Sequence, residues 1–347
     1  MRHPIDINAD SGGTFASPRD AASHWSRAAE LTPTVFDLIR QFVDAPGILG
    51  RAAHHHLDGG GKAFRARLLM ASALALDLEP DVFLPAAAAC ELLHNASLVH
   101  DDMQDQDAYR RHRTTVWHEF GPDAALCLGD HFISQTHALL AQTPDATAGL
   151  RISGRFAAAT SHAIVGQLQE ASANARNLPN WSSYVAMAEG KSGALFALPV
   201  QTACDLAGLN DVVNDAVERA LSLYGVAYQI KDDLLDILGG KEGRPAGTDL
   251  APGKANALVA LAVDAGETVV GEALRPDVAP EAKDALLAHL RRPESLERLH
   301  QAHASILCRA MRHATLMPQA LWSTAIEGLA QIVALPAAES HTAAEVA

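Results

Sequence analysis

The sequence predicts an all-α protein folded as a single-domain helical bundle. Aromatic residues make up only 5% of the 347 residues, and no alternating apolar and polar run lies between Asn-Gly or Asp-Gly turns, so strand signals are nearly absent. Glycine-rich stretches at 58–62 and 239–247 stand where helices should end. Between such breaks the chain is rich in Ala and Leu, which favour helices.

The expected helices cover most of the chain between two short tails. They are predicted at 30–50, 62–77, 81–104, 121–142, 148–173, 181–205, 211–238, 252–265, 280–312 and 317–334. Residues 1–20 are rich in Gly, Pro, Ser and Asp, and residues 336–347 lack an apolar stripe, so both segments are expected to be disordered. Residues 21–335 should then form one domain, because no linker interrupts them.

Composition argues against several classes of function. The formal net charge of −14 disfavours nucleic acid as a partner, because a surface that binds phosphate backbones needs a positive excess. The four cysteines lie far apart, without zinc or disulfide spacing, which suits a reducing cytoplasm. The N-terminus is charged where a signal peptide is apolar, and no uninterrupted apolar run reaches the ~18 residues of a membrane span. We therefore expect a cytoplasmic protein with no membrane span.

Two aspartate-rich motifs, DDMQD at 101–105 and DDLLD at 232–236, lie inside apolar helical segments. Their carboxylates belong to Asp101, Asp102, Asp105, Asp232, Asp233 and Asp236. On a helix the first and last Asp of each motif share one face. Clustered carboxylates repel one another unless a cation intervenes, and Mg²⁺ prefers such oxygen ligands together with water and phosphate oxygens. A solvated acidic helix end would explain one motif, but two copies favour a magnesium site for a diphosphate.

Basic residues accompany the first motif. Arg110 and Arg111 follow it closely, and Lys62 and Arg65 come after the glycine-rich stretch at 58–62. Guanidinium groups match phosphate oxygens through paired hydrogen bonds, and a lysine adds a compact point charge. These residues suit a second diphosphate, bound without metal.

Over residues 55–260, which include these motifs, the chain resembles the trans-isoprenyl diphosphate synthase (polyprenyl synthetase) family. Within that family it resembles the geranylgeranyl diphosphate synthases. Matching elements are GKAFR at 61–65, ELLHNASLVHDD at 91–102, GKSGALF at 190–196, YQIKDDLLD at 228–236 and GRPAGTDLAPGK at 243–254. The resemblance implies the isoprenoid synthase type I fold, a helical bundle around a central cavity, and a homodimer.

The resemblance also implies roles for the matching residues. The six motif aspartates would bind Mg²⁺, with three ions per active site, and would act in catalysis together with Lys191. The isopentenyl diphosphate site would comprise Lys62, Arg65, His94 and Arg111. The allylic diphosphate site would comprise Arg110, Lys191, Ser192, Gln229, Arg244 and Lys254. Three residues depart from the family pattern: Ala66 replaces a proline, Glu170 an aspartate and Arg244 a lysine. The last change is expected to alter loop closure over the allylic diphosphate.

The expected reaction joins isopentenyl diphosphate to an allylic diphosphate to give a linear all-trans prenyl diphosphate. It needs no protein nucleophile, because Mg²⁺ and lysines would neutralise the leaving diphosphate while the protein positions the second substrate. Ala96 and Ser97 lie about one helical turn before Asp101, where aromatic side chains close the pocket in this family. Their small size predicts geranylgeranyl diphosphate first, with farnesyl or longer polyprenyl diphosphates as alternatives.

Two other classes of function stay open. A terpene cyclase also ionises an allylic diphosphate with Mg²⁺ on an aspartate-rich helix, but it needs only one diphosphate site, so Lys62, Arg65 and Arg111 would be idle. A non-catalytic subunit that regulates a partner synthase need not keep complete acidic motifs, and both are complete here. Outside the motifs, His54–His56 and Lys231 are expected on solvated surfaces.

Overall fold

Helices form almost all the regular structure of the protein. The computed structural model describes residues 18–172, 177–240, 245–250, 256–274 and 280–336. In chain order the helices are α1 (Pro18–Val43), α2 (Gly47–Asp58), α3 (Phe64–Leu74), α4 (Pro80–Gln104), α5 (Val116–Phe120), α6 (Pro122–Leu140), α7 (Ala146–Ser172), α8 (Trp181–Ala188), α9 (Ala194–Leu206), α10 (Asp211–Leu238), α11 (Ala257–Asp264), α12 (Val269–Ala273), α13 (Pro280–Leu290), α14 (Pro293–Ala314) and α15 (Gln319–Val333). A π-helical turn, η1 (Glu189–Gly193), joins α8 to α9, and η2 (Thr248–Leu250) is a 3₁₀ turn. The strands β1 (Tyr109–Arg110) and β2 (Arg113–Thr114) form an antiparallel hairpin.

The all-α prediction is confirmed, with corrections to individual elements. The segment expected as one helix at 30–50 holds the end of α1 and the start of α2, which break at Ala45–Pro46 because proline disfavours helical geometry in the residue before it. The segment expected at 280–312 divides into α13 and α14 just before Pro293 for the same reason. α1 begins at Pro18, inside the range expected for the N-terminal tail. The hairpin and the short helices α5 and α12 were not predicted.

The helices α4 and α10 carry the two aspartate-rich motifs and are mostly buried. α4 packs against α3 and α6, and α10 packs against α9, η1 and α14. Of the described helices, α4 is long and apolar enough, by length and composition alone, to span a membrane. However, 67% of its most apolar window is buried inside the protein, as in a core helix of a bundle.

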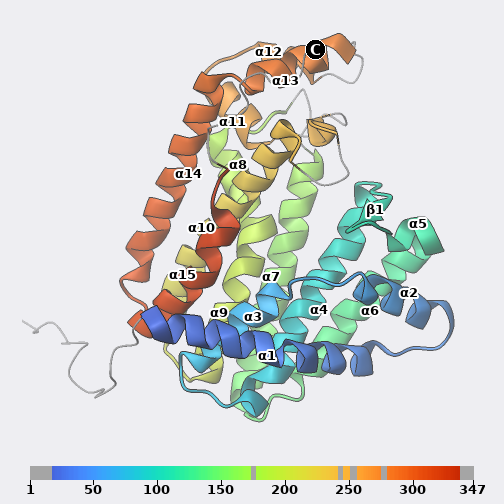
Figure 1. Cartoon of the computed structure of the whole chain (residues 1–347), viewed down its shortest axis with the longest axis vertical. Helices are drawn as coiled ribbons and strands as arrows, with labels where there is room; N and C mark the ends of the chain where they lie inside the picture. The colour runs from blue at the N-terminus through green and yellow to red at the C-terminus, as the bar shows by residue number, and fades with distance from the viewer. Residues whose placement is uncertain (1–17, 173–176, 241–244, 251–255, 275–279, 337–347) are drawn as a thin grey trace, which may run out of the picture.

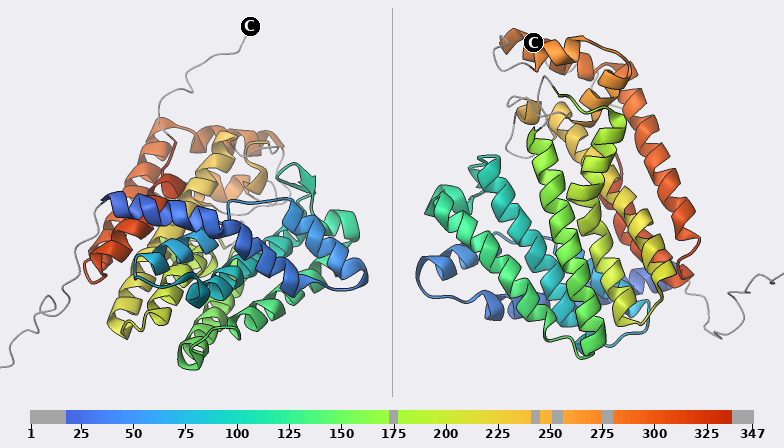
Figure 2. Two further views of the ribbon diagram at one scale, coloured as in Figure 1. Left: turned by 60° about the horizontal axis from the view of Figure 1, so that its bottom comes forward. Right: turned by 180° about the vertical axis from the view of Figure 1, so that it is seen from behind.

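The two motifs lie at the same end of the bundle. Figure 1 shows α1 crossing one end of the molecule, whereas α12 and α13 cover the other, and α4 and α10 both run toward that second end. In the right-hand view of Figure 2, α6 and α7 come close to each other where the chain passes from one to the other. The first and last helices are joined by Trp25, whose Nε1 donates a 2.7 Å hydrogen bond to the carbonyl of Thr324. A Cβ at Gly328 would lie 1.9 Å from the Trp25 ring, so a glycine is required there.

Candidate active site

The first motif, at the end of α4, has two partly exposed carboxylates and one buried carboxylate. Asp101 and Asp105 are partly exposed and lie one turn apart on one face. Asp102 is 2% exposed and accepts hydrogen bonds from Nε and Nη2 of Arg110, each at 2.7 Å. This bidentate ion pair fixes the guanidinium of Arg110 beside the motif.

The second motif, at the end of α10, buries two of its three carboxylates. Asp232 is partly exposed, whereas Asp233 and Asp236 are 6% and 1% exposed. Asp233 accepts hydrogen bonds from the hydroxyl of Tyr184 at 2.7 Å and from the backbone N–H that begins α11 at 2.8 Å. Asp236 accepts a hydrogen bond from a backbone N–H of η2 at 3.3 Å. The buried carboxylates thus hold the following turns in position and leave Asp232 partly open to solvent.

An ion pair between Lys191 and Glu170 lies close to both motifs. Nζ of Lys191 donates to the carboxylate of Glu170. Burial by itself lowers the pKa of Lys191, but the charges of Glu170 and Asp101 outweigh it and raise that pKa. Burial raises the pKa of Asp101 to about 6, an effect that Lys191 opposes. Burial also raises the pKa of Tyr184, and both the second motif and Glu170 add to that shift. Lys191 therefore stays protonated among carboxylates from α4 and α7.

The turn η1 brings Ser192 against α10. A π-helical turn holds one residue more than an α-helical turn and often occurs at functional sites. A Cβ at Gly225 would lie 2.5 Å from the Cα of Gly193, so only glycine permits this approach. The hydroxyl of Ser192 donates to Oε1 of Gln229 at 2.9 Å, and Nε2 of Gln229 donates to Asp233 at 3.0 Å. Two residues expected at the allylic site are thereby connected to the second motif.

The residues expected to bind isopentenyl diphosphate include two buried polar atoms without partners. Among the described residues, neither Nε of Arg65 nor Nδ1 of His94 has a hydrogen-bond partner, although both atoms are buried. Burial lowers the pKa of His94 well below its ordinary value, and Arg65 and Arg111 lower it further, so the imidazole is neutral. Lys62 is exposed at the edge of this basic site. Buried polar atoms are normally paired in folded proteins, so these two atoms are candidates to bind a polar ligand.

The β1–β2 hairpin presents Arg111 to the same site. Its turn residues, Arg111 and His112, have φ angles of 50° and 62°, in the left-handed region. Such geometry costs about 1–3 kcal/mol for residues other than glycine and is concentrated at functional sites. The guanidinium of Arg111 lies against Gly61, where a Cβ would be only 2.7 Å from Nη1. The hairpin therefore connects the GKAFR element to the end of α4.

The carboxylates of the site suit a metal ion that is bound partly by the protein and partly by substrate and water, rather than by protein ligands alone. Within the described parts of the chain, no three His, Cys, Asp or Glu side chains converge closely enough to hold a metal ion. Mg²⁺ commonly takes one or two carboxylates and completes its shell with water and substrate phosphates, so the pairs of carboxylates here fit that ion. The metal roles of the six aspartates stay predictions. Arg244 and Lys254 lie outside the described residues.

Comparison with known proteins agrees with this arrangement. The model of the polyprenyl synthetase family matches residues 46–289, which include both aspartate-rich motifs and the GKAFR element. The chain belongs to the polyprenyl synthetase family. It is 38% identical over 194 residues to a (2E,6E)-farnesyl diphosphate synthase of Mycobacterium tuberculosis, a match covering 55% of this chain and 53% of that protein. The chain thus spans about half the length of that relative.

Further relatives within the family differ in the products that their names record. A geranylgeranyl pyrophosphate synthase of Geoglobus acetivorans is 32% identical over 69% of this chain and 75% of that protein. The solved structure of a decaprenyl diphosphate synthase from Rhodobacter capsulatus superposes with a TM-score of 0.78 at 22% identity, covering 90% of this chain and 99% of that one. This likeness shows that the polyprenyl synthetase fold is shared.

Several side chains that support the family site were missed or misjudged from sequence. Glu91 accepts the backbone N–H of Ala66 at 3.3 Å, a bond that the family's usual proline cannot make. Nε2 of His56, expected on a solvated surface, donates to Oδ1 of Asn95 at 2.9 Å, and burial lowers its pKa to about 4. Lys231, also expected to be solvated, donates at 2.7 Å to a carbonyl in the last turn of α15. The expectation for His56 was wrong, whereas Lys231 stays partly exposed to solvent. Only for Glu91 did a matching sequence element point to the site.

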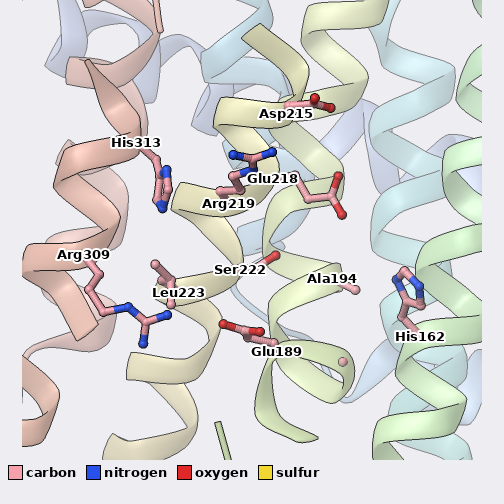
Figure 3. A pocket seen from close by; sticks show the side chains of 11 residues that line it. His162, Glu189, Ala194, Asp215, Glu218, Arg219, Ser222, Leu223, Arg309 and His313 are labelled. Atoms are coloured by element: carbon pink, nitrogen blue, oxygen red, sulfur yellow. The ribbon is translucent and has the colours of Figure 1, made fainter. Parts of the chain in front are cut away.

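A second hollow lies beside η1, apart from the motif site (Figure 3). It has a volume of about 580 Å³ and is lined by Glu189 and Gly190 of η1, by residues of α10 and by Arg309 of α14. Burial raises the pKa of Glu189, and Arg309 opposes that shift. Lys191 and Ser192, the next residues along the turn, instead contact the groups described above.

Proposed function

We propose that this protein is a magnesium-dependent trans-prenyltransferase that joins isopentenyl diphosphate to an allylic diphosphate. The observation that carries the proposal is the presence of two neighbouring sites that each suit a diphosphate, the first through bound Mg²⁺. One is formed by the aspartate-rich motifs, and the other by a basic site in which Nε of Arg65 and Nδ1 of His94 have no partner among the described residues. A terpene cyclase holds a single diphosphate, so the second site favours a reaction between two diphosphates.

Magnesium would be held by the motif aspartates, three ions per active site as the resemblance implies. The partly exposed carboxylates of Asp101, Asp105 and Asp232 support this proposal, because oxygen donors suit a hard cation. When bound, Mg²⁺ neutralises the charge of the leaving diphosphate.

The protein's own groups would bind and orient the two substrates. Lys191, kept protonated by its neighbours, and Arg110, oriented by Asp102, suit the allylic diphosphate together with Ser192 and Gln229. The isopentenyl diphosphate would be held by Lys62, Arg65, His94 and Arg111. Most of the rate advantage would come from this positioning, because the protein forms no covalent bond to either substrate.

The reaction balances without a further reactant. The allylic C1–O bond breaks and its electron pair leaves with the diphosphate. The double bond of isopentenyl diphosphate then forms a new C–C bond to the allylic C1, and loss of a proton restores a double bond. The released diphosphate is the base that the family resemblance implies.

The proposed product is geranylgeranyl diphosphate. Ala96 and Ser97, about one turn before Asp101, are small. The hydroxyl of Ser97 donates to the carbonyl of His94 at 2.8 Å, so its proton already has an acceptor when an apolar prenyl tail lies beside it. Small residues at these positions support an allylic pocket longer than a farnesyl chain requires.

We also propose a homodimer that forms through α6 and α7. α6 exposes Leu126 (47%), and α7 exposes Ile164 (60%), Val165 (52%) and Leu168 (67%). Exposed apolar side chains clustered on one face are typical of protein–protein interfaces. A cytoplasmic location is proposed because all four cysteines are free, as they are in reducing compartments.

The deciding experiment is product analysis. The protein would be incubated with Mg²⁺, labelled isopentenyl diphosphate and, separately, dimethylallyl, geranyl and farnesyl diphosphate, and the dephosphorylated products identified by mass. We expect linear geranylgeraniol, lost with a chelator and reduced more than about 100-fold by Asp101→Asn. Asp211→Asn, a fully comparable change at a carboxylate with an 82% exposed side chain, should leave activity unchanged.

Each alternative predicts a different product. Farnesol as the longest product would keep the reaction class but refute the argument from Ala96 and Ser97. A cyclic hydrocarbon formed from the allylic substrate alone would replace the proposal with a terpene cyclase. Activity that appears only after a second synthase subunit is added would favour a regulatory subunit.

A further inference from the structure

Tyr228 lies where the two proposed substrate sites meet. It precedes Gln229 on α10 and is 37% exposed, although its neighbours on that helix are buried. Its ring centroid lies 5.2 Å from that of Phe196 on α9, and Cζ of Arg65 lies 5.3 Å from the centroid of the same ring. Tyr228 and Arg65 therefore both contact Phe196, and the phenol lies beside the basic site.

Electrostatics indicates where the hydroxyl of Tyr228 is directed. Burial is the largest influence on the pKa values of Arg65, Arg110 and Arg111, and the Tyr228 phenol raises all three. Because such an influence falls with distance, the effect on these three guanidinium groups agrees with the contact that Tyr228 and Arg65 share on the ring of Phe196. Two of them, Arg65 and Arg111, belong to the proposed isopentenyl diphosphate site.

A phenol hydroxyl is suited to a ligand at this position. Guanidinium groups only donate hydrogen bonds, whereas a hydroxyl can donate one and accept others. Phosphate oxygens only accept, so a hydroxyl beside them adds a donor without adding charge. We propose that the hydroxyl of Tyr228 donates a hydrogen bond to the diphosphate of isopentenyl diphosphate, between Arg65 and Arg111. This inference rests on the proposed function and adds a substrate-binding residue to it.

The test removes only the hydroxyl. Tyr228→Phe keeps the ring that packs on Phe196, and it should raise KM for isopentenyl diphosphate about tenfold, because a hydrogen bond to a charged group is lost. KM for the allylic diphosphate and kcat should change less than about twofold, since the hydroxyl acts on one substrate. Calorimetry with isopentenyl diphosphate alone should show a dissociation constant that is larger by about the same factor.

The chain offers a matched control one turn earlier on the same helix. Tyr224 is 6% exposed, and its ring lies 6.0 Å from that of Trp322 in α15. Tyr224→Phe also removes one phenol hydroxyl, and it should leave both KM values unchanged. Melting temperatures of both variants would verify that each is folded.

Three results would overturn the inference. These are an unchanged affinity of Tyr228→Phe for isopentenyl diphosphate, an equal rise of KM for the allylic substrate, and an equal effect of Tyr224→Phe. Failure of the proposed function is a separate outcome: the wild-type protein would then incorporate no isopentenyl diphosphate with any allylic primer. The calorimetric comparison of Tyr228→Phe with wild type would still decide the inference in that case.

Discussion

Replacement of Gly225 by alanine should both destabilise the protein and impair its activity. Gly225 lies on α10 opposite η1, the turn that carries Lys191 and Ser192. An added Cβ would lie 2.5 Å from the Cα of Gly193 and 2.9 Å from the carbonyl carbon of Ser192. All of these atoms belong to the backbone, so no side-chain rotation can relieve the contact.

The size of the effect follows from these distances. Non-bonded carbon atoms approach to about 3.5 Å at their optimum, so η1 must move away from α10 by roughly 1 Å. Overpacking of this kind typically costs about 1–3 kcal/mol in the free energy of unfolding. The same displacement moves Lys191 and Ser192, and an error of about 1 Å in positioning can cost up to about 100-fold in rate. We therefore expect kcat to fall at least tenfold.

Urea unfolding and steady-state kinetics on the same preparation would measure both effects. Gly149→Ala is the matched control, because its Cβ would meet only ordinary contacts, the nearest at 3.5 Å from Cβ of Thr143. Alanine favours helix over glycine by about 1 kcal/mol, so this variant should be slightly stabilised and fully active. If Gly225→Ala proved as stable and active as wild type, the close approach of η1 to α10 would not be needed.

Two further predictions concern buried charge and pH. Asp205→Asn should lower the free energy of unfolding, measured with urea, by roughly 2–3 kcal/mol, because the Asp205 side chain is 0% exposed and pairs with Arg155. Asp211→Asn is the control: it changes an exposed ion pair and should cost less than about 1 kcal/mol in the same assay. The pKa of His56 is 6.5 in the unfolded chain and about 4 in the folded protein. On acidification to pH 5.5 the unfolded chain therefore binds a proton at His56, whereas the folded protein does not. Proton uptake by unfolded His56 should therefore lower the free energy of unfolding by about 1 kcal/mol between about pH 7 and pH 5.5. His56→Gln should remove this contribution, whereas His54→Gln, a change at an exposed histidine, should leave it in place. Equal pH slopes for wild type and His56→Gln would contradict the assignment.

Local patterns were sufficient for the fold class and the family. Helical periodicity, the scarcity of strand signals and the breaks at glycine depend only on neighbouring residues, so they could be read directly from the chain. The two DDxxD motifs could be recognised for the same reason, since residues one turn apart share a helix face wherever the helix lies. The GKAFR element and the arginine pair completed a pattern that the family match then confirmed.

Tertiary packing alone decided how these residues are used. Nothing in the spacing of either motif distinguishes Asp102, which pairs with Arg110, from Asp101, which stays partly exposed. The left-handed turn at Arg111 and the burial of His56 likewise depend on segments distant in the sequence. Local sequence determines which backbone conformations are favourable, but the partner and solvent exposure of a side chain depend on what other helices bring beside it.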